Sequence, residues 1–413
     1  MKLSAHAESM LAGELGPARR WAVEHQLQVG RMFDAEDMVE VSQAHMMADP
    51  ESIGLAGLEL VERFAALPLD QRRVAIPMIT DPRGVDLDYY DPLGQTEGMA
   101  DIERRFIKAC RAIGIVMTNT CINYQTVMPP VRGEHVAYGD TGVVIYSNSF
   151  CGARSNFEGG PSALAAGLTG QTPRYGLHLD KNRRATRRFL VETQLEELTD
   201  WGVLGAVIGR RSGSYWEVPV IEGIERVPTS DEAKHMGAAM ASYGSTPLFH
   251  IVSITPECDR LADVDGADLP VETVSKEDVA ALRGSFGASG EKVDVVVFAA
   301  PQLSIVEMQR VAELCRGRRR HPDTALLVCT AASVYVDARA AGFIDDIEAF
   351  GGRVLQGTCF YQQYAREIGE ANGWTRLLSN STKIVNILGG YGYKPALASM
   401  EACVDAAVAG EVV

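Results

Sequence analysis

The sequence lacks a long hydrophobic run. None of its apolar stretches approaches the ~20 residues that a membrane-spanning helix requires, so we do not expect a membrane protein. The first residues, Met1–Glu8, also lack the apolar core that is typical of a secretory signal peptide. We therefore expect the protein to work in the cytoplasm.

Positive charge is scarce as well. The 413 residues contain 39 lysines and arginines against 54 aspartates and glutamates, which gives a formal net charge of −15. Because a nucleic acid presents a backbone of phosphates, its partners need a basic face, and this balance argues against nucleic-acid binding. The apolar and charged fractions are those of a globular enzyme, and the length allows two or three domains.

Closely spaced cysteine pairs are absent too. The eight cysteines are scattered and no CxxC pair occurs, which favours reduced thiols over a disulfide framework. Three of them lie in apolar segments, as small core residues do: Cys110, Cys315 and Cys403. Four others have polar neighbours or follow predicted strands: Cys121, Cys258, Cys329 and Cys359. Ligands of iron or zinc that converge from distant segments occupy positions of that kind.

The pattern of apolar residues divides the chain into three regions. Residues 1–70 are predicted to be helical, including 35–41 and 58–67, because apolar residues recur near the helical period. Residues 71–290 mix short strands and loops and are predicted to form an α/β region. Residues 291–413 are predicted to form a parallel α/β domain.

This last region alternates strands and helices. The predicted strands are Val293–Phe298, Ala325–Cys329 and Arg353–Gln356, and the predicted helices are Ser304–Cys315 and Ala331–Ala341. Such alternation gives a parallel sheet with right-handed crossovers. The strand ends, including Gln302 and Cys359, then share one edge, where ligands of open α/β sheets bind.

A polar segment, Tyr146–Ser162, stands out in the middle of the chain. It follows a predicted strand, Val143–Tyr146, and leads into a predicted helix that starts at Pro161. Its side chains capable of hydrogen bonding include Ser147, Asn148, Ser149, Arg154, Asn156, Glu158 and Ser162. Because a guanidinium fork suits a carboxylate or a phosphate, we expect this segment to bind an anionic substrate.

Several blocks of sequence, taken in order, resemble one family. They are Val41–His45, Asn119–Tyr124, Gly133–His135, Ser147–Asn156, Glu158–Ala166, Tyr175–His178, Gly357–Cys359 and Ser379–Lys383. By their order and spacing, over nearly all 413 residues, the sequence resembles the catalytic or large-subunit region of aconitase X. The resemblance implies a multidomain α/β fold of the aconitase type, with parallel sheets flanked by helices and with cluster and substrate bound by residues 71–290.

The resemblance also implies an activity. Members of the family are dehydratases built around an iron–sulfur cluster, and they use a small partner region that we expect here as a separate small subunit. Bacterial members resemble cis-3-hydroxy-L-proline dehydratases, which form Δ1-pyrroline-2-carboxylate, and we expect that hydro-lyase reaction here. The alternatives are mevalonate 5-phosphate dehydratase, as in archaeal members, and an iron-binding protein without catalysis.

One departure from the family pattern concerns the cluster. Where many members carry Gly-Cys-Pro-His, this chain has Ala299-Ala-Pro-Gln302, so the cysteine ligand implied at Ala300 is absent. The resemblance then implies Cys121 and Cys359 as ligands, with Cys258 as the third and Cys329 as the next choice. A [2Fe-2S] cluster is favoured, with [3Fe-4S] or [4Fe-4S] as alternatives.

The implied chemistry needs a base, a carboxylate anchor and proton carriers. By analogy with the serine base of aconitases, Ser381 is the expected base and Ser149 its competitor, and either would need nearby positive charge to activate it. Lys383 or Arg154 could hold the substrate carboxylate, and Glu158 or His135 could carry protons. The expected substrate contacts are Ser147, Asn148, Arg154, Asn156, Ser162, His45 and His135.

Overall fold

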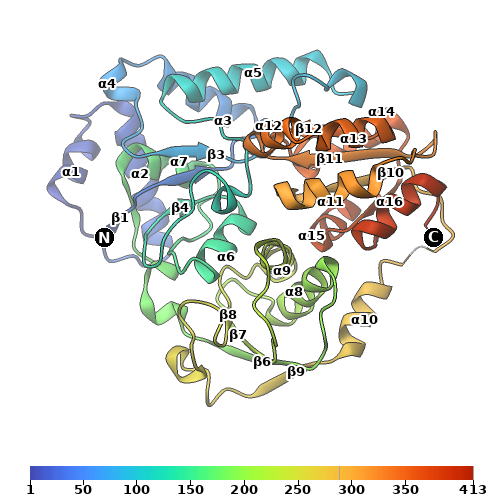
Figure 1. Ribbon diagram of the computed structural model, residues 1–413. Coiled ribbons are helices and arrows are strands. Elements are labelled where there is room, and N and C mark those ends of the chain that lie inside the picture. The colour runs from blue at the N-terminus through green and yellow to red at the C-terminus, as the bar shows by residue number, and fades with distance from the viewer. Residues whose placement is uncertain (288, 413) are drawn as a thin grey trace.

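Three parallel sheets organise the chain (Figure 1). The computed structural model describes residues 1–287 and 289–412. A three-stranded sheet has the order β3-β2-β4, a four-stranded sheet β8-β7-β6-β9 and a five-stranded sheet β12-β11-β10-β13-β14. Their parallel pairing and the helices packed against them confirm the α/β fold expected from the sequence.

The three-stranded sheet belongs to the N-terminal part of the chain. Its strands are β2 (Ala44–Met46), β3 (Met78–Thr80) and β4 (Ala137–Tyr138), and β1 (Met38–Glu40) pairs separately with β5 (Gln171–Pro173). Apolar side chains of α2 (Pro17–Met32), α3 (Pro50–Ala65), α5 (Glu97–Ala112) and α7 (Pro161–Thr169) form its core. The remaining helices here are α1 (Ala5–Ala12), α4 (Leu69–Arg72) and α6 (Thr141–Ser149).

The four-stranded sheet lies at the bottom of Figure 1. Its strands are β6 (Arg187–Val191), β7 (Pro219–Glu222), β8 (His250–Ile251) and β9 (Val271–Val274). Helices α8 (Leu198–Ser212) and α9 (Ser230–Gly244) lie side by side between this sheet and the rest of the molecule, and α10 (Lys276–Gly284) packs against α8.

The five-stranded sheet is buried on both faces. Its strands are β10 (Val295–Leu303), β11 (Ala325–Thr330), β12 (Arg353–Gln356), β13 (Arg376–Ser379) and β14 (Lys394–Leu397). One face packs on α11 (Ile305–Cys315), α12 (Ala332–Ala340), α13 (Phe343–Phe350) and α16 (Met400–Ala409). The other face packs on α14 (Ala365–Asn372), α15 (Thr382–Leu388) and the α8–α9 pair. Because successive residues of a strand point to opposite faces, residues 295–300 of β10 are an unbroken apolar run.

The sequence predictions for this sheet are confirmed, and two earlier ones are wrong. Strands β10, β11 and β12 and helices α11 and α12 occur where they were expected, and Ser304 and Glu307 form the predicted capping box. Residues 143–146, however, belong to α6, because the Asp140 side chain accepts a hydrogen bond from Val143 N and caps a helix. Residues 35–41 contain β1 rather than a helix, since Met38–Glu40 pair with β5.

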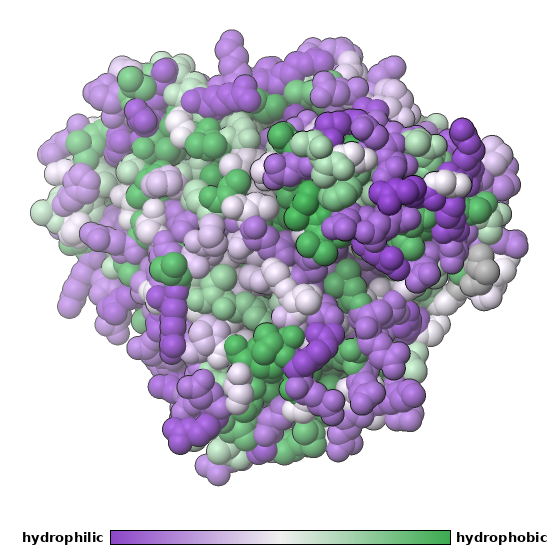
Figure 2. Space-filling view, viewed as in Figure 1, coloured by the Kyte–Doolittle hydropathy of each residue, from purple (hydrophilic) through white to green (hydrophobic). Residues whose placement is uncertain are grey.

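The outer surface mixes polar and apolar side chains. On the face shown in Figure 2, hydrophilic side chains dominate the periphery and hydrophobic ones form small groups between them. Within residues 1–287 and 289–412, no helix has the length and apolar character needed to span a bilayer.

Helices α8 and α9 approach each other unusually closely through glycines. A Cβ added at Gly205 would lie 2.1 Å from the Met236 carbonyl oxygen, and one added at Gly209 would lie 2.4 Å from that of Met240. Such distances are far inside van der Waals contact, so only glycine allows these two backbones to pack. The pair supports the five-stranded sheet from below.

Substitution of Gly205 by alanine should therefore destabilise the fold. We expect Gly205→Ala to lower the free energy of unfolding by about 1–3 kcal/mol or more, because the helices must separate. Gly284→Ala is the matched control, since it also lies in a helix but its added Cβ would meet nothing within 4 Å. Denaturant titration measures both; equal stability of the two variants would contradict the packing argument.

A buried ion-pair cluster ties α9 to α11. The Lys234 ammonium contacts the Glu307 carboxylate and lies 3.1 Å from Asp231 Oδ1, and His235 Nε2 lies 2.8 Å from Glu307 Oε1. Burial alone would raise the pKa of Glu307, but the Lys234 charge and the His235 hydrogen bond lower that pKa to about 2. The ionised carboxylate thus stabilises the folded state.

This stabilisation should depend on pH in a defined direction. Since the pKa of Glu307 in the folded state lies below that of an unfolded glutamate, about 4.3, the contribution is complete above about pH 5 and is lost as the pH falls towards 2. We expect Glu307→Gln to cost about 3–5 kcal/mol at pH 7. That loss of unfolding free energy should shrink by about 1 kcal/mol between pH 5 and 3.5, which denaturant titrations at the two pH values measure. Glu313→Gln is the control: because Glu313 is exposed, its substitution should change the free energy of unfolding little. A deficit of the same size at both pH values would refute this assignment.

Candidate active site

The carboxyl ends of the three-stranded and five-stranded sheets meet. Arg83, just after β3, forms a parallel bridge with Thr358, just after β12, and Arg83 N lies 2.8 Å from the Gly357 carbonyl oxygen. The Asp86 carboxylate accepts a hydrogen bond from Gln356 N at 2.9 Å. Residues that follow strands of both sheets therefore share one buried centre, as expected for ligand sites of parallel sheets.

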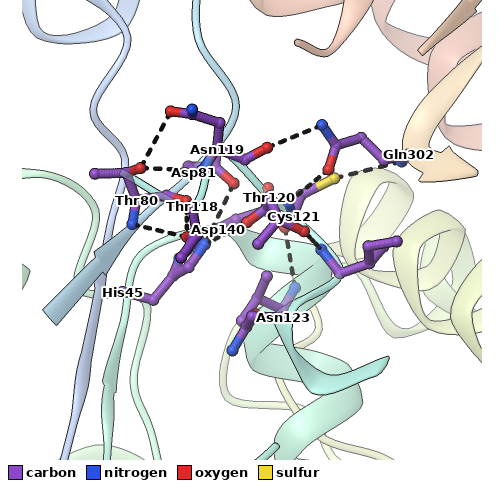
Figure 3. Close-up of polar contacts among 12 residues, drawn as sticks. His45, Thr80, Asp81, Thr118, Asn119, Thr120, Cys121, Asn123, Asp140 and Gln302 are labelled. Atoms are coloured by element: carbon purple, nitrogen blue, oxygen red, sulfur yellow. Dashed lines mark hydrogen bonds and ion pairs between the residues drawn. The ribbon is translucent and has the colours of Figure 1, made fainter. Parts of the chain in front are cut away.

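On the three-stranded side, the centre holds a histidine and a carboxyl group (Figure 3). His45 of β2 lies 2.8 Å from the Thr120 carbonyl oxygen through Nε2 and 3.6 Å from Asp81 Oδ1. Burial lowers the pKa of His45, so its neutral form is favoured. Burial, together with the charges of Asp140 and Cys121, raises the pKa of Asp81 well above its usual value.

A buried ion pair joins the two sides. Asp140 follows β4 and lies 3.4 Å from the ammonium of Lys383, which belongs to α15 beyond β13. Although burial opposes it, the Lys383 charge keeps the pKa of Asp140 below its usual value. Burial also opposes the charge on Lys383, but Asp140 and then Cys121 raise the pKa of that ammonium. The Lys383 ammonium further lies 5.4 Å from the centre of the Tyr361 ring.

Two thiols complete the centre. Cys121 and Cys359 are both buried, and the neighbouring Cys359 side chain, followed by burial, raises the pKa of Cys121. Gln302, near the end of β10, contacts Cys121 through both its backbone and its side chain (Figure 3). The two cysteines predicted as metal ligands are thus brought together from segments far apart in the sequence.

The third predicted metal ligand lies elsewhere. Cys258 packs against Val220 and Val264 beside the four-stranded sheet, and its thiol lies 3.6 Å from the Arg260 carbonyl oxygen. Cys329, the next choice for the third ligand, lies nearer to Cys121 and Cys359. Its thiol lies 3.9 Å from Oγ1 of Thr358, the residue before Cys359. Among the described residues, no group of three or more histidine, cysteine, aspartate or glutamate side chains is arranged to hold a metal ion. Cys121 and Cys359 therefore lie together without the third cysteine of our prediction.

Ser381 lies beside this centre and also has a structural task. It is the N-cap of α15, where its Oγ accepts a hydrogen bond from Ile384 N at 3.3 Å and donates one to the Ala300 carbonyl. Ser149 ends α6, whereas Asp140 caps its start, and Ser149 Oγ accepts a hydrogen bond from Phe249 N. The structure thus places Ser381, but not Ser149, next to the strand that carries Gln302.

Most polar side chains of the segment 146–162 form hydrogen bonds or ion pairs within the protein. Each of its predicted substrate contacts except Ser147 has an internal partner: Asn148 binds the backbone of Ser155 and Pro247, Arg154 pairs with Asp180, Asn156 binds Tyr175, Leu177 and Tyr215, and Ser162 binds His25. Ser147 is fully buried, without a partner among the described residues. Glu158 is buried as well, and burial raises its pKa to about 7.

Another predicted substrate contact, His135, also lies away from the centre. Its Nδ1 lies 2.9 Å from Nδ1 of His178, and the two rings are stacked. Burial, followed by the charges of Arg154 and Arg183, lowers the pKa of His135. Of the predicted substrate contacts, the structure brings only His45 to the thiols and Lys383.

Several residues of the centre escaped the sequence analysis. Asp81 and Asp140 were not among the predicted site residues, and residues 143–146 after Asp140 were predicted as a strand. Gln302 was noted as a departure from a motif, without a role. Their common signal is position: each lies at or just after the end of a parallel strand.

The arrangement has the parts that acid–base chemistry on a small anion needs. It combines a buried ammonium, two carboxyl groups with pKa values shifted in opposite directions, a neutral imidazole and a pair of thiols. Groups of one chemical type held at different protonation states are typical of active sites.

Comparison with known proteins places the chain in a family. Models described as aconitase X first, second and third domain match residues 1–181, 185–284 and 293–409. The phosphomevalonate dehydratase large subunit of Methanothermobacter thermautotrophicus is 34% identical, over 96% of this chain and 95% of that protein. The cis-3-hydroxy-L-proline dehydratase of Pseudomonas aeruginosa is 30% identical, over 99% of this chain and 70% of that protein.

A solved structure agrees with these matches. The crystal structure of Thermococcus kodakaraensis aconitase X in its holo form superposes with a TM-score of 0.87 at 28% identity, covering 98% of this chain and 100% of that one. The fold and the sequence matches thus extend over nearly the whole chain, and the chain belongs to the aconitase X family.

Proposed function

We propose that this chain, a hydro-lyase of the aconitase X family, removes water from cis-3-hydroxy-L-proline to give Δ1-pyrroline-2-carboxylate. The observation that carries this choice is the set of charged groups in the buried centre. The ammonium of Lys383 is paired with the carboxylate of Asp140, and the Asp81 carboxyl group beside them favours the protonated form. Such a centre matches an amino acid, which has one ammonium and one carboxylate, better than it matches a doubly charged phosphate.

Each residue of the centre has a role in this reaction. Lys383 binds the substrate carboxylate, and the carboxyl groups of Asp81 and Asp140 face the ring nitrogen. The base removes the proton at C2, the hydroxyl at C3 leaves with a proton as water, and the resulting enamine becomes the cyclic imine. We assign the base to Ser381 by analogy with the aconitases; as a base, its oxygen would give up the hydrogen bond that its hydroxyl donates to the Ala300 carbonyl.

An iron centre would be held by Cys121 and Cys359. When bound there, iron supplies a Lewis acid that favours departure of the C3 hydroxyl. The described residues present two neighbouring thiols for it, and the third cysteine of our prediction lies beside the four-stranded sheet.

A second substrate, mevalonate 5-phosphate, has support from the comparisons. The relative with 34% identity is a phosphomevalonate dehydratase large subunit, and this chain covers 95% of it. A phosphate would need further cations, yet the buried guanidinium of Arg183 pairs with Glu257 and that of Arg154 pairs with Asp180. We therefore place this substrate second.

A small subunit completes the proposal. Relatives that this chain spans almost fully are named large subunits, and the cis-3-hydroxy-L-proline dehydratase of P. aeruginosa extends beyond it, since the chain covers 70% of that protein. We infer that a small aconitase X subunit binds this chain. The cytoplasmic location stays a prediction.

The substrate is tested directly. The chain, purified without oxygen together with its small subunit, should convert cis-3-hydroxy-L-proline to a product that is lighter by one water, as mass spectrometry will show. Mevalonate 5-phosphate should remain unchanged under the same conditions. Turnover of the phosphate alone would reverse the order of the two candidates.

The role of Ser381 is tested by Ser381→Ala. We expect kcat to fall about 10²–10⁴-fold, because a positioned base contributes that much, while the chain still folds. Ser399→Ala is the matched control: Ser399 caps α16 in the same way, with Oγ 3.1 Å from Ala402 N. Loss of a cap costs about 1 kcal/mol in either variant. If both variants kept full turnover, Ser381 would be a helix cap only.

A further inference from the structure

Gln302 lies beside Cys121 (Figure 3), and its side chain also bonds to Thr358, which precedes Cys359. Its side chain is fully buried. The amide nitrogen donates to the Asn119 carbonyl at 3.2 Å and to the Thr358 carbonyl at 3.0 Å, and the amide oxygen accepts from Cys121 N at 3.2 Å. One side chain thus joins the segment that ends in Cys121 to the segment that ends in Cys359.

The backbone of Gln302 adds a contact to sulfur. Its N–H donates to Cys121 Sγ at 3.4 Å, so the same residue holds both the backbone and the thiol of Cys121. Hydrogen bonds to a sulfur ligand adjust its charge and hence the reduction potential of the iron that it binds. Gln302 therefore has the means to set both the position and the electronic character of that sulfur.

Gln302 is itself fixed from the opposite side. Its carbonyl accepts a hydrogen bond from the Lys234 ammonium at 3.1 Å. Lys234 is fully buried and held by Glu307 and Asp231, so α9 and α11 keep the end of β10 in place. A residue anchored in this way can impose its geometry on the more irregular segments around the two cysteines.

We propose that Gln302 is a positioning residue for the iron centre. It holds the segment of Cys121 beside the segment of Cys359, so that both thiols can bind one centre. The proposal rests on the proposed function, which assigns iron to these two thiols. It adds that an amide on β10, itself no ligand, determines how well they bind it.

The test compares substitutions of two buried glutamines, one beside the thiols and one away from them. Gln302→Met keeps the volume and removes every side-chain hydrogen bond, and Gln302→Glu keeps an acceptor for Cys121 N. Gln26→Met is the control, because Gln26 is equally buried and donates to Thr169 Oγ1 and the Gln171 carbonyl, away from the thiols. Each variant is purified with the small subunit, and its affinity for iron, its visible absorption spectrum and its turnover are measured.

We expect Gln302→Met to bind iron about 10–100-fold more weakly and to shift the absorption of the thiolate–iron bands. Gln302→Glu should lose less, and Gln26→Met should keep the parent affinity and spectrum even where its melting temperature falls. In the metal-free chain, Cys121 and Cys359 of Gln302→Met should react faster with a thiol reagent than those of the parent protein.

Other outcomes separate this inference from the proposed function. Parent-like iron affinity and spectrum in Gln302→Met would overturn the positioning role while leaving the dehydratase intact. If Gln302→Met does not fold, Gln302→Glu decides, and a parent-like spectrum there rejects the proposal. A parent protein that binds iron at neither cysteine and dehydrates neither substrate removes the proposed function, and the inference falls with it.

Discussion

The ion pair between Asp140 and Lys383 is the interaction on which the centre depends. Two opposite charges inside a protein are tolerated only when they are close and further hydrogen bonded. Asp140 meets this condition by capping α6 through Val143 N, and Lys383 meets it through Asp140 and the ring of Tyr361. Because one partner follows the three-stranded sheet and the other the five-stranded sheet, the pair fixes how the two sheets face each other.

The remaining features of the centre follow from that arrangement. Once the sheet edges meet, burial and then the nearby charge of Asp140 raise the pKa of Asp81, so its carboxyl group favours the protonated form, while Asp140 stays ionised beside Lys383. The edges also bring Cys121 and Cys359 into contact. The α8–α9 pair carries Lys234, which holds the end of β10 from below. The site therefore forms only where the edges of the three-stranded and five-stranded sheets meet, and no single segment contains it.

The sequence predicted strands β10, β11 and β12, helices α11 and α12, and part of the centre. Strands of the five-stranded sheet were visible because burial on both faces leaves an apolar run, and α11 was visible through its capping box. A strand was predicted for residues 143–146 because β-branched residues favour strands. The segment is helical because Asp140 caps the helix and its side chains pack in the core.

The site residues divide in the same way. Cys121, Cys359, Ser381, Lys383 and His45 were found through the family resemblance. The polar segment 146–162 looked like a binding loop because its side chains can form many hydrogen bonds. Those bonds are made within the protein, and a sequence cannot show where a hydrogen bond goes. Gln302 and Asp81 were missed for the converse reason: each acquires its partners only through a segment that lies far away in the chain.

The separation between the partners of the ion pair also bears on how the chain is made. Lys383 follows Asp140 by 243 residues. At a synthesis rate of ~5–20 residues per second, Asp140 leaves the ribosome roughly 10–50 s before its counter-ion exists. During that interval its carboxylate must stay hydrated or take up a proton, so the edge of the three-stranded sheet remains open on the nascent polypeptide. The centre therefore cannot close until Lys383 has been synthesised.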